Sequence, residues 1–500
     1  MKPRPRRSTV SSSAVGAAAF VAGFSTMGAE MAAPRLLAPY VGTTQLVWTS
    51  VIGVLLAALA AGGFIGGRLA DRWPQRRHLG RVLMGAGAWL AAIPLAARPL
   101  LQWGSDSLIR AEIGPFLISL AAVSLLFAPP VLLAGMIGPW AVRLAGAGRQ
   151  DLGRVAGVLS GIATLGSIAG TFGTTLLGLP LLGTRRTLVV LAAALVAAGA
   201  VVARLGWRDA ASAGLLLLFL GWQASGPIAA RSDTLYESES LYHYARIDGA
   251  LRGPRMLVVN EGAAAQSITL PPEGRAGGVW GVLASAAQLT GAEQELRVLV
   301  VGLAGGTVAA QIAHDLDGKR TVQIDGIEID AAIVEASRRH LALDEIPGLE
   351  VHVADGRVAV RRSDETYDLI VVDAFRGSYV PAHLATVEFF EECRARLSSE
   401  GVVALNVAVG RSGSALLDAL AATLRRAFPA VGKLDVPPSL SPIVNTVLVA
   451  SPSAFRVASD APAVQSLPAA EDDSALALSD DRAPVELLTD ASLLGVLGLQ

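Results

Sequence analysis

Three acidic residues in the C-terminal half stand at or just after short apolar runs that are typical of parallel strands. They are Glu328, Asp355 and Asp373. Because open α/β sheets bind ligands at the carboxyl ends of their strands, these carboxylates can belong to one site. Glu328 comes about 20 residues after a glycine-rich turn, where an acidic residue can bind both hydroxyls of a ribose. The spacing therefore predicts a site for an adenosyl group.

The glycine-rich turn contains Gly302, Gly305 and Gly306 and lies between a predicted strand, 297–301, and a predicted helix, 308–316. This arrangement brings backbone N–H groups and a helix N-terminus close to a ligand. Glycines there permit positive φ angles and a close approach. The motif is shared by many α/β domains, so the carboxylates that follow it carry the prediction.

Asp355 and Asp373 also have structural explanations, and a third aspartate, Asp330, has a structural role alone. Asp355 with Gly356 is suited to hold the amino group of an adenine, but an Asp-Gly pair also favours a turn. Asp330 is predicted to be the N-cap of a helix over 331–340. Asp373 is either a functional carboxylate or a residue that caps the loop after its strand, and replacing it by alanine would separate the two.

Residues 291–500 alternate between short apolar strands and helices. The predicted strands are 297–301, 322–329, 350–354, 367–372 and 401–407. Such alternation implies a parallel sheet with right-handed crossovers, so a Rossmann-like α/β domain with a C-terminal tail is expected. Short β-rich pieces within 231–290 predict a small N-terminal β-cap. Residues 456–482 resemble a mobile linker or loop in composition.

The composition separates two halves of the chain. Of its 500 residues 52% are hydrophobic and 17% charged, and the mean hydropathy is +0.50. Acidic residues are scarce before Asp233 and common after it. The net charge of −1, without a basic stripe, gives no indication of a nucleic-acid partner. Cys393 is the only cysteine and the six histidines lack ligand spacing, so no metal is expected.

Residues 1–230 predict a multi-pass α-helical membrane domain, because a spanning helix needs about 20 mainly apolar residues. The seven candidate spans are 12–34, 45–67, 79–97, 113–142, 153–182, 186–203 and 210–230. The fourth contains Pro129 and Pro130, which predict a kink or break. Glu30, inside the first span, is a functional candidate because ionisable groups in lipid are costly; a structural ion pair is the alternative.

The distribution of basic residues predicts the orientation in the cell membrane. The N-terminal tail and the loops on its side hold fourteen Lys and Arg residues, against five in the alternate loops. The N-terminus is therefore expected in the cytoplasm. Seven spans would place the soluble half outside, whereas adenosyl cofactors are made in the cytosol. One segment that does not cross would return it inside, so the side of the soluble half stays open.

The motifs together resemble spermidine synthase in order and spacing. The segments that carry the resemblance are Val300–Thr307, Ile327–Asp330, Ala354–Gly356 and Tyr367–Asp373. Leu241–His243 and Gln266–Ser267 look like the β-cap of that family, and Ser479–Glu486 is similar to the end of its membrane-fused members. The resemblance thus covers most of the chain.

The resemblance implies transfer of an aminopropyl group from decarboxylated S-adenosylmethionine to a polyamine such as putrescine, with release of methylthioadenosine. The residues implied to bind the adenosyl co-substrate are Gly302, Gly305, Gly306, Glu328, Asp355 and Gly356. Asp373 would accept a proton from the attacking amine, because an ammonium group is not a nucleophile until it is deprotonated. Tyr242 and Gln266 would line the site from the cap.

Two departures from the family keep other functions open. Leu303 and Ala304 stand where the family has an acidic residue, and Arg376 stands where it has a second carboxylate. A guanidinium repels a diamine, so Arg376 would suit an anionic substrate. The alternatives are an S-adenosylmethionine-dependent methyltransferase with another acceptor, or a non-catalytic transporter or sensor with a nucleoside-binding domain. A homo-oligomer is compatible with the sequence, which does not determine the oligomeric state.

Overall fold

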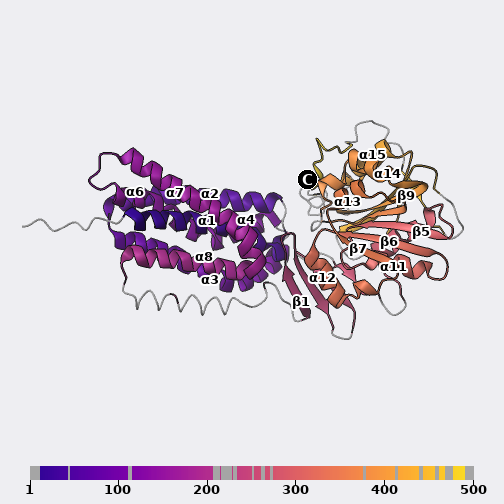
Figure 1. Cartoon of the computed structure of the whole chain (residues 1–500), viewed down its shortest axis with the longest axis horizontal. Helices are drawn as coiled ribbons and strands as arrows, with labels where there is room; N and C mark the ends of the chain where they lie inside the picture. Colours follow the sequence, from indigo (N-terminus) through magenta and orange to yellow (C-terminus); the bar gives the residue numbers. More distant parts are fainter. Residues whose placement is uncertain are drawn as a thin grey trace, which may run out of the picture. The chain divides into compact units, whose positions relative to one another are not determined.

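The computed structural model of the chain forms two compact units, Met1–Ala230 and Arg231–Gln500. The first consists of helices and the second combines strands and helices (Figure 1). The residues that the structure describes are 12–42, 45–110, 115–205, 214, 228, 233–250, 253–260, 265–270, 274–375, 379–410, 415–437, 443–455, 461–467 and 477–489.

Five stretches of the first unit are long and apolar enough to cross a membrane, within the part of the chain that the structure describes. They are Ser13–Val41, Val47–Arg72, Arg76–Leu101, Ala128–Ala145 and Leu152–Ala203. The helices are α1 (Ser12–Val41), α2 (Gln45–Arg72), α3 (Arg76–Arg110), α4 (Pro115–Leu126), α5 (Ala128–Gly135), α6 (Ile137–Ala145), α7 (Leu152–Gly173), the π-helical η1 (Thr174–Gly178) and α8 (Leu179–Ala203).

The predicted break in the fourth span is present. Residues 115–145 form the three helices α4, α5 and α6, and Pro129 and Pro130 lie in the first turn of α5. The fifth and sixth predicted spans form one stretch of 52 residues that is interrupted at Gly183, whose φ of 75° and ψ of 169° are not helical. The seventh predicted span, 210–230, lies outside the described residues except for 214 and 228.

Glycines bring α1 and α7 into backbone contact. A Cβ atom at Gly166 or Gly170 would lie 2.1 Å from the carbonyl oxygen of Phe20 or Phe24, respectively. Small residues thus allow these two helices to pack closely. The same does not hold for Gly157 and Gly161, where an added Cβ would meet nothing within 4 Å.

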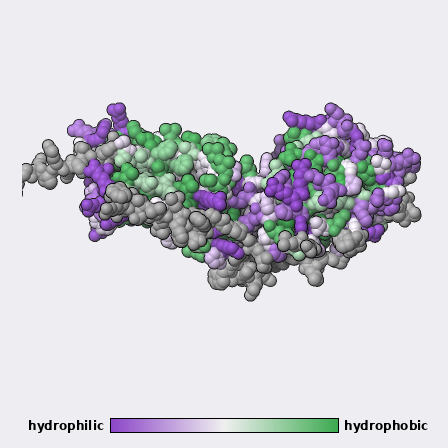
Figure 2. All heavy atoms as spheres, turned by 60° about the horizontal axis from the view of Figure 1, so that its bottom comes forward, coloured by the Kyte–Doolittle hydropathy of each residue, from purple (hydrophilic) through white to green (hydrophobic). Residues whose placement is uncertain are grey.

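Large apolar side chains cover the outside of the helical unit (Figure 2). Phe64, Leu165, Phe172 and Leu181 are each more than 60% exposed. A helix that is apolar on its outer face as well as toward its neighbours is typical of a membrane span.

The second unit is built on an eight-stranded sheet in the order β12-β10-β11-β9-β8-β5-β6-β7. The strands are β5 (Glu295–Val301), β6 (Thr321–Glu328), β7 (Leu349–Val353), β8 (Tyr367–Val372), β9 (Leu397–Gly410), β10 (Ala430–Leu434), β11 (Ile443–Ser451) and β12 (Gln465–Ser466). Strands β5 to β9 pair in parallel, whereas β10, β11 and β12 pair antiparallel. The predicted Rossmann-like domain is confirmed.

Helices cover both faces of this sheet (Figure 1). On one face α13 (Gly356–Arg362), α14 (Val387–Arg394) and α15 (Ala415–Ala427) share a core that includes Phe389 and Phe390. On the other face lie α10 (Gly278–Ser285), α11 (Thr307–Leu316) and α12 (Ala331–His340). Because the chain winds from β5 to β6 on one side and to β8 on the other, β5 and β8 flank the switch point where such sheets bind ligands.

The β-cap is a four-stranded antiparallel sheet of β1 (Thr234–Glu239), β2 (Tyr244–Gly249), β3 (Arg255–Val259) and β4 (Ala265–Ile268). Its apolar side packs against α12 through Ile247, Leu257 and Ile333. The sequence did not predict β1, because this segment is mostly polar and lacks an apolar alternation.

Candidate active site

The glycine turn after β5 requires glycine at two positions. Gly302 and Gly306 have φ angles of 90° and 83°, which other residues rarely adopt. A Cβ at Gly302 would also lie 2.6 Å from the Cα of Ala374. The turn therefore packs directly against the chain that leaves β8 at Asp373.

The backbone amides of this turn all donate to acceptors within the protein. Those of Gly302 and Leu303 donate to the Ile327 carbonyl, Ala304 to Glu328, Gly305 to Ser267 and Gly306 to the Leu303 carbonyl. The amides of residues 302–306 are therefore engaged within the protein, where they fix the shape of the turn and hold Glu328 beside it. The approach of Gly302, Gly305 and Gly306 to an adenosyl group stays a prediction.

Glu328 lies at the end of β6 and is only 6% exposed. Its carboxylate accepts hydrogen bonds from the amide of Ala304 at 2.9 Å and from the amide of Asp330 at 3.0 Å. Burial raises the pKa of Glu328, although these two amides oppose the shift. A carboxylate offers about four acceptor positions, so two remain for donors such as the hydroxyls of a ribose.

Asp330 is the N-cap of α12, as predicted, and accepts a hydrogen bond from the amide of Ala332. It also bonds to the hydroxyl of Ser240 at 2.5 Å and to Nδ1 of His243 at 3.2 Å. Burial would raise the pKa of Asp330, but the hydrogen bonds from His243 and Ser240 outweigh it, and the pKa is lowered. Asp330 thereby ties the β-cap to the end of β6.

The two site residues predicted in the β-cap lie beside these contacts. Tyr242, with 48% of its surface exposed, precedes His243 in the turn between β1 and β2. Gln266 is half-buried in β4 next to Ser267. The hydroxyl of Ser267 accepts a hydrogen bond from the amide of Gly305 at 2.8 Å. The cap thus reaches the glycine turn and the end of β6, although Ser240, His243 and Ser267 were not predicted as its anchors.

Asp355 follows β7 and caps α13, since it accepts the amide of Val358 at 3.0 Å. Its other oxygen lies 3.1 Å from Nε2 of His383. A Cβ at Gly356 would lie 2.4 Å from Val301, so this glycine lets α13 pack on β5. Asp355 therefore has the predicted turn-forming role and also faces an imidazole, which the sequence did not indicate.

Asp373 lies at the end of β8, and one side chain among the described residues donates a hydrogen bond to its carboxylate. The amide nitrogen of Asn406, on β9, donates to Asp373 Oδ1 at 2.7 Å. Burial raises the pKa of Asp373 to about 7, with Asn406 opposing the shift. The side-chain carbonyl of Asn406 is itself buried and has no hydrogen-bond partner among the described residues, so a donor such as an amine can bond to it.

Arg357, 7% exposed, connects the C-terminal segment to this region. Its guanidinium bonds to both oxygens of Asp480, at 2.6 and 2.8 Å, and to Glu392. It also donates to the carbonyl of His383 at 3.2 Å, and thereby holds the residue that faces Asp355. Residues 477–482 thus form an anchored loop, so of the two predictions for 456–482 the loop, and not the mobile linker, holds for this part.

Two further predictions concern Arg376 and metal binding. Arg376 lies outside the described residues. Among the residues that the structure does describe, Asp325, Glu350 and His352 form one cluster with donors suitable for a metal, and the imidazole lies 3.5 and 3.7 Å from the two carboxylates. At these distances the three side chains form ion pairs on a partly exposed surface, and we do not assign a metal site to them.

Comparison with known proteins decides the family. Residues 285–443 match the family model described as the spermine/spermidine synthase domain. The polyamine aminopropyltransferase of Vibrio vulnificus is 30% identical over 213 residues, which cover 38% of this chain and 69% of that protein. This chain belongs to the polyamine aminopropyltransferase family. Its members are transferases of alkyl groups other than methyl.

The chain is also similar to a second curated protein and to a solved structure. A probable polyamine aminopropyl transferase of Bifidobacterium longum is 29% identical over 194 residues, 39% of this chain and 42% of that protein. The crystal structure of a probable spermidine synthase from Corynebacterium glutamicum aligns with a TM-score of 0.40 and 19% identity, over 51% of this chain and 97% of that one.

The assignment of Glu328 can be tested by binding alone. Glu328→Gln replaces one acceptor oxygen by an NH₂ group that faces a backbone amide, so one donor is left unpaired. We expect the affinity for methylthioadenosine, measured by calorimetry, to fall about tenfold. Glu335→Gln, on the exposed side of α12, is the matched control and should bind normally. Equal affinity of Glu328→Gln and the wild type would rule out the ribose-binding role.

The pairing of Asp373 with Asn406 predicts a shift in pH dependence. The hydrogen bond from Asn406 favours the charged form of Asp373, and Asn406→Leu removes it. If activity requires the ionised carboxylate, it rises as pH increases through about 7, and the variant moves this rise to higher pH. The measurement is kcat/KM against pH for both proteins; an unchanged profile would exclude Asp373 as the titrating group.

Proposed function

We propose that the chain is a membrane-bound aminopropyltransferase that uses decarboxylated S-adenosylmethionine and a polyamine acceptor such as putrescine. The observation that carries the proposal is the Asp373–Asn406 pair beside Gly302, at the switch point of the sheet. A carboxylate that titrates near neutral pH and an unpaired buried carbonyl are both acceptors, and an amine substrate supplies donors for both.

The reaction follows from this arrangement. The acceptor amine must lose a proton before it attacks, and the Asp373 carboxylate can take that proton with its pKa of about 7. The amine nitrogen then forms a bond to the aminopropyl carbon next to the sulfonium. The carbon–sulfur bond breaks, its electrons return to sulfur, and methylthioadenosine leaves. Glu328 and Asp355 would hold the adenosine part, as the family resemblance implies.

The product identifies the reaction. The purified full chain is incubated with decarboxylated S-adenosylmethionine and putrescine, and mass spectrometry follows methylthioadenosine and spermidine. We expect both products in equal amounts. Binding of methylthioadenosine without conversion of any diamine would overturn aminopropyl transfer. A parallel reaction with S-adenosylmethionine labelled in its methyl group tests the methyltransferase alternative. Arg376 favours that alternative because it stands where the family has a second carboxylate.

The membrane location is part of the same proposal. It is supported by the five apolar stretches and by the exposed apolar side chains of the helical unit. Six passes precede residue 205 if the interruption at Gly183 marks a turn between two spans, which would return the chain to the side of its N-terminus. Whether 210–230 also crosses then decides the side of the transferase unit. A reporter fused at residue 500 should show the cytoplasmic side, where adenosyl co-substrates are made.

A further inference from the structure

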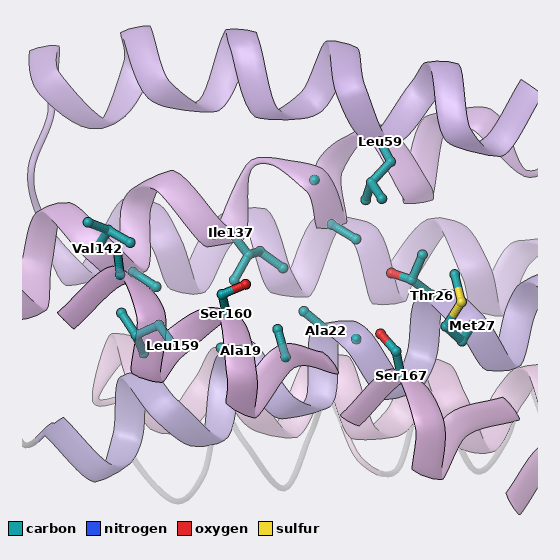
Figure 3. Close-up of a pocket in the computed structure, with 17 residues that line it drawn as sticks. Ala19, Ala22, Thr26, Met27, Leu59, Ile137, Val142, Leu159, Ser160 and Ser167 are labelled. Carbon is teal, nitrogen blue, oxygen red and sulfur yellow. The ribbon is translucent and has the colours of Figure 1, made fainter. Parts of the chain in front are cut away.

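A cavity of about 430 Å³ that is open on part of its surface lies between helices of the helical unit (Figure 3). Its walls come from α1, α2, α5, α6 and α7, so segments far apart in the sequence line it. A volume of this size is within the range of sites for small organic ligands. No residue of the transferase site lines the cavity.

The lining of the cavity carries no charge. All 17 lining residues are uncharged, and their polar side chains are the hydroxyls of Thr26, Ser160 and Ser167. Glu30, one turn further along α1 than Thr26, is not among them. A passage for a polyamine would need carboxylates to replace the water around each ammonium group. The cavity is thus unsuited to the charged substrate of the transferase unit.

Backbone contacts fix the helices around the cavity in two pairs. A Cβ at Gly23 would lie 2.2 Å from the carbonyl oxygen of Ala163, so α1 and α7 touch through their backbones. A Cβ at Gly62 would lie 2.1 Å from the carbonyl oxygen of Leu132, so α2 and α5 touch as well. Each pair forms one continuous part of the wall of the cavity.

Water is a poor occupant of this space. A buried water molecule needs two to four polar partners, and the three hydroxyls are spread over α1 and α7. An empty space would leave the lining side chains without contacts on one side. An apolar molecule fills it best, and a few hydroxyls in an otherwise apolar lining fix the orientation of such a ligand.

We propose that this cavity binds a neutral membrane lipid with an uncharged head group. Its hydrocarbon chain packs against side chains such as Ala22, Leu59 and Ile137, and a hydroxyl or ester carbonyl bonds to Thr26, Ser160 or Ser167. A phospholipid suits the site less, because no lining residue offers a cation to its phosphate. The inference rests on the proposed membrane location and is independent of the transferase reaction.

The test uses the full chain in phosphatidylcholine vesicles and a diacylglycerol with a photoreactive acyl chain. Labelled peptides are mapped by mass spectrometry, and we expect saturable labelling in 19–27 and 156–167. Ser160→Leu fills part of the cavity and removes one hydroxyl, so labelling there should fall about tenfold. Thr164→Leu is the matched control, since Thr164 lies one turn away on α7, is exposed and does not line the cavity.

A competition experiment on the wild type does not depend on how the variants fold. Unlabelled diacylglycerol should abolish the labelling at 19–27 and 156–167, and added phosphatidylcholine should not. Labelling that never saturates, that phosphatidylcholine displaces equally well, or that Ser160→Leu leaves unchanged would overturn the proposal. Failure of the protein to insert into the vesicles, detected by alkaline extraction, would instead refute the membrane location.

Discussion

Replacing Asp373 by asparagine is expected to lower kcat about 100- to 10,000-fold, the usual contribution of a positioned general base. Asparagine has nearly the same shape but cannot accept the proton of the attacking amine. The affinity for methylthioadenosine should stay unchanged, because the adenosine part is assigned to other residues. Single-turnover kinetics with saturating co-substrate and calorimetry of methylthioadenosine binding measure the two effects separately.

The same substitution should not destabilise the protein at alkaline pH. The pKa of Asp373 is about 7 in the folded chain against an ordinary value of 3.8, so the folded state binds its proton more tightly. The free energy of unfolding therefore falls as pH rises from about 4 to about 7. Asp373→Asn removes this dependence, and its thermal midpoint at pH 8 should equal or exceed that of the wild type.

A purely structural Asp373 would give the opposite pattern. If the carboxylate only capped the loop after β8, its loss would lower the thermal midpoint, and activity would fall in proportion to the unfolded fraction. Asp368→Asn is the control, since Asp368 lies on the same strand and bonds to Arg297 and Ser398 at its other end. That variant should keep normal kcat. A drop in kcat of equal size in both variants would count against a catalytic Asp373.

The strands of the parallel sheet could be predicted because each is a short apolar run that ends in a polar residue. β5, β6 and β8 begin and end within two residues of the predicted bounds, and Glu328 and Asp373 lie at their ends as expected. Strand ends are determined locally, because burial on both faces requires a continuous apolar run. β1 escaped prediction because its pairing with β2, rather than its own sequence, makes it a strand.

The partners of the site residues could not be predicted. Asn406 reaches Asp373 only because β9 pairs with β8, and Ser267 reaches Gly305 only because β4 packs beside the glycine turn. These contacts join residues more than 30 positions apart, and no spacing rule applies to them. His383 lies 28 positions from Asp355, which it faces, and neither its sequence neighbours nor its spacing indicated a site.

The glycine turn shows what a motif predicts and what only the structure adds. The strand, glycine turn and helix were placed correctly, but the partners of the amides of 302–306, which are Ile327, Glu328, Ser267 and Leu303, could not be read from the motif. A dinucleotide site must leave such amides free for a pyrophosphate. In this chain the amide of Ala304 instead holds the carboxylate of Glu328 at the end of β6.

The largest effect on stability is expected for Arg357→Leu. This change leaves Glu392 and Asp480 without their bidentate partner and removes the donor to the His383 carbonyl. Because the side chains of Glu392 and Asp480 are 20% and 42% exposed, the loss should lie between the values for exposed and buried ion pairs, at about 1 to 3 kcal/mol. Hydrogen exchange on the full chain should show that much loss of protection in α13 and in residues 477–489, because Arg357 is what joins them.

Arg361→Leu separates this network from ordinary surface charge. Arg361 bonds to the same Glu392 oxygen, at 2.6 Å, but its side chain is 56% exposed, and its loss should cost less than about 1 kcal/mol. If the two variants lose the same protection from hydrogen exchange, the burial of Arg357 does not explain its contribution to stability. If only Arg357→Leu also weakens methylthioadenosine binding, the C-terminal segment stabilises the Asp355 side of the site through Arg357 and His383. This would explain why Asp480, more than 100 residues beyond Asp355, is bound to Arg357 on the helix that Asp355 caps.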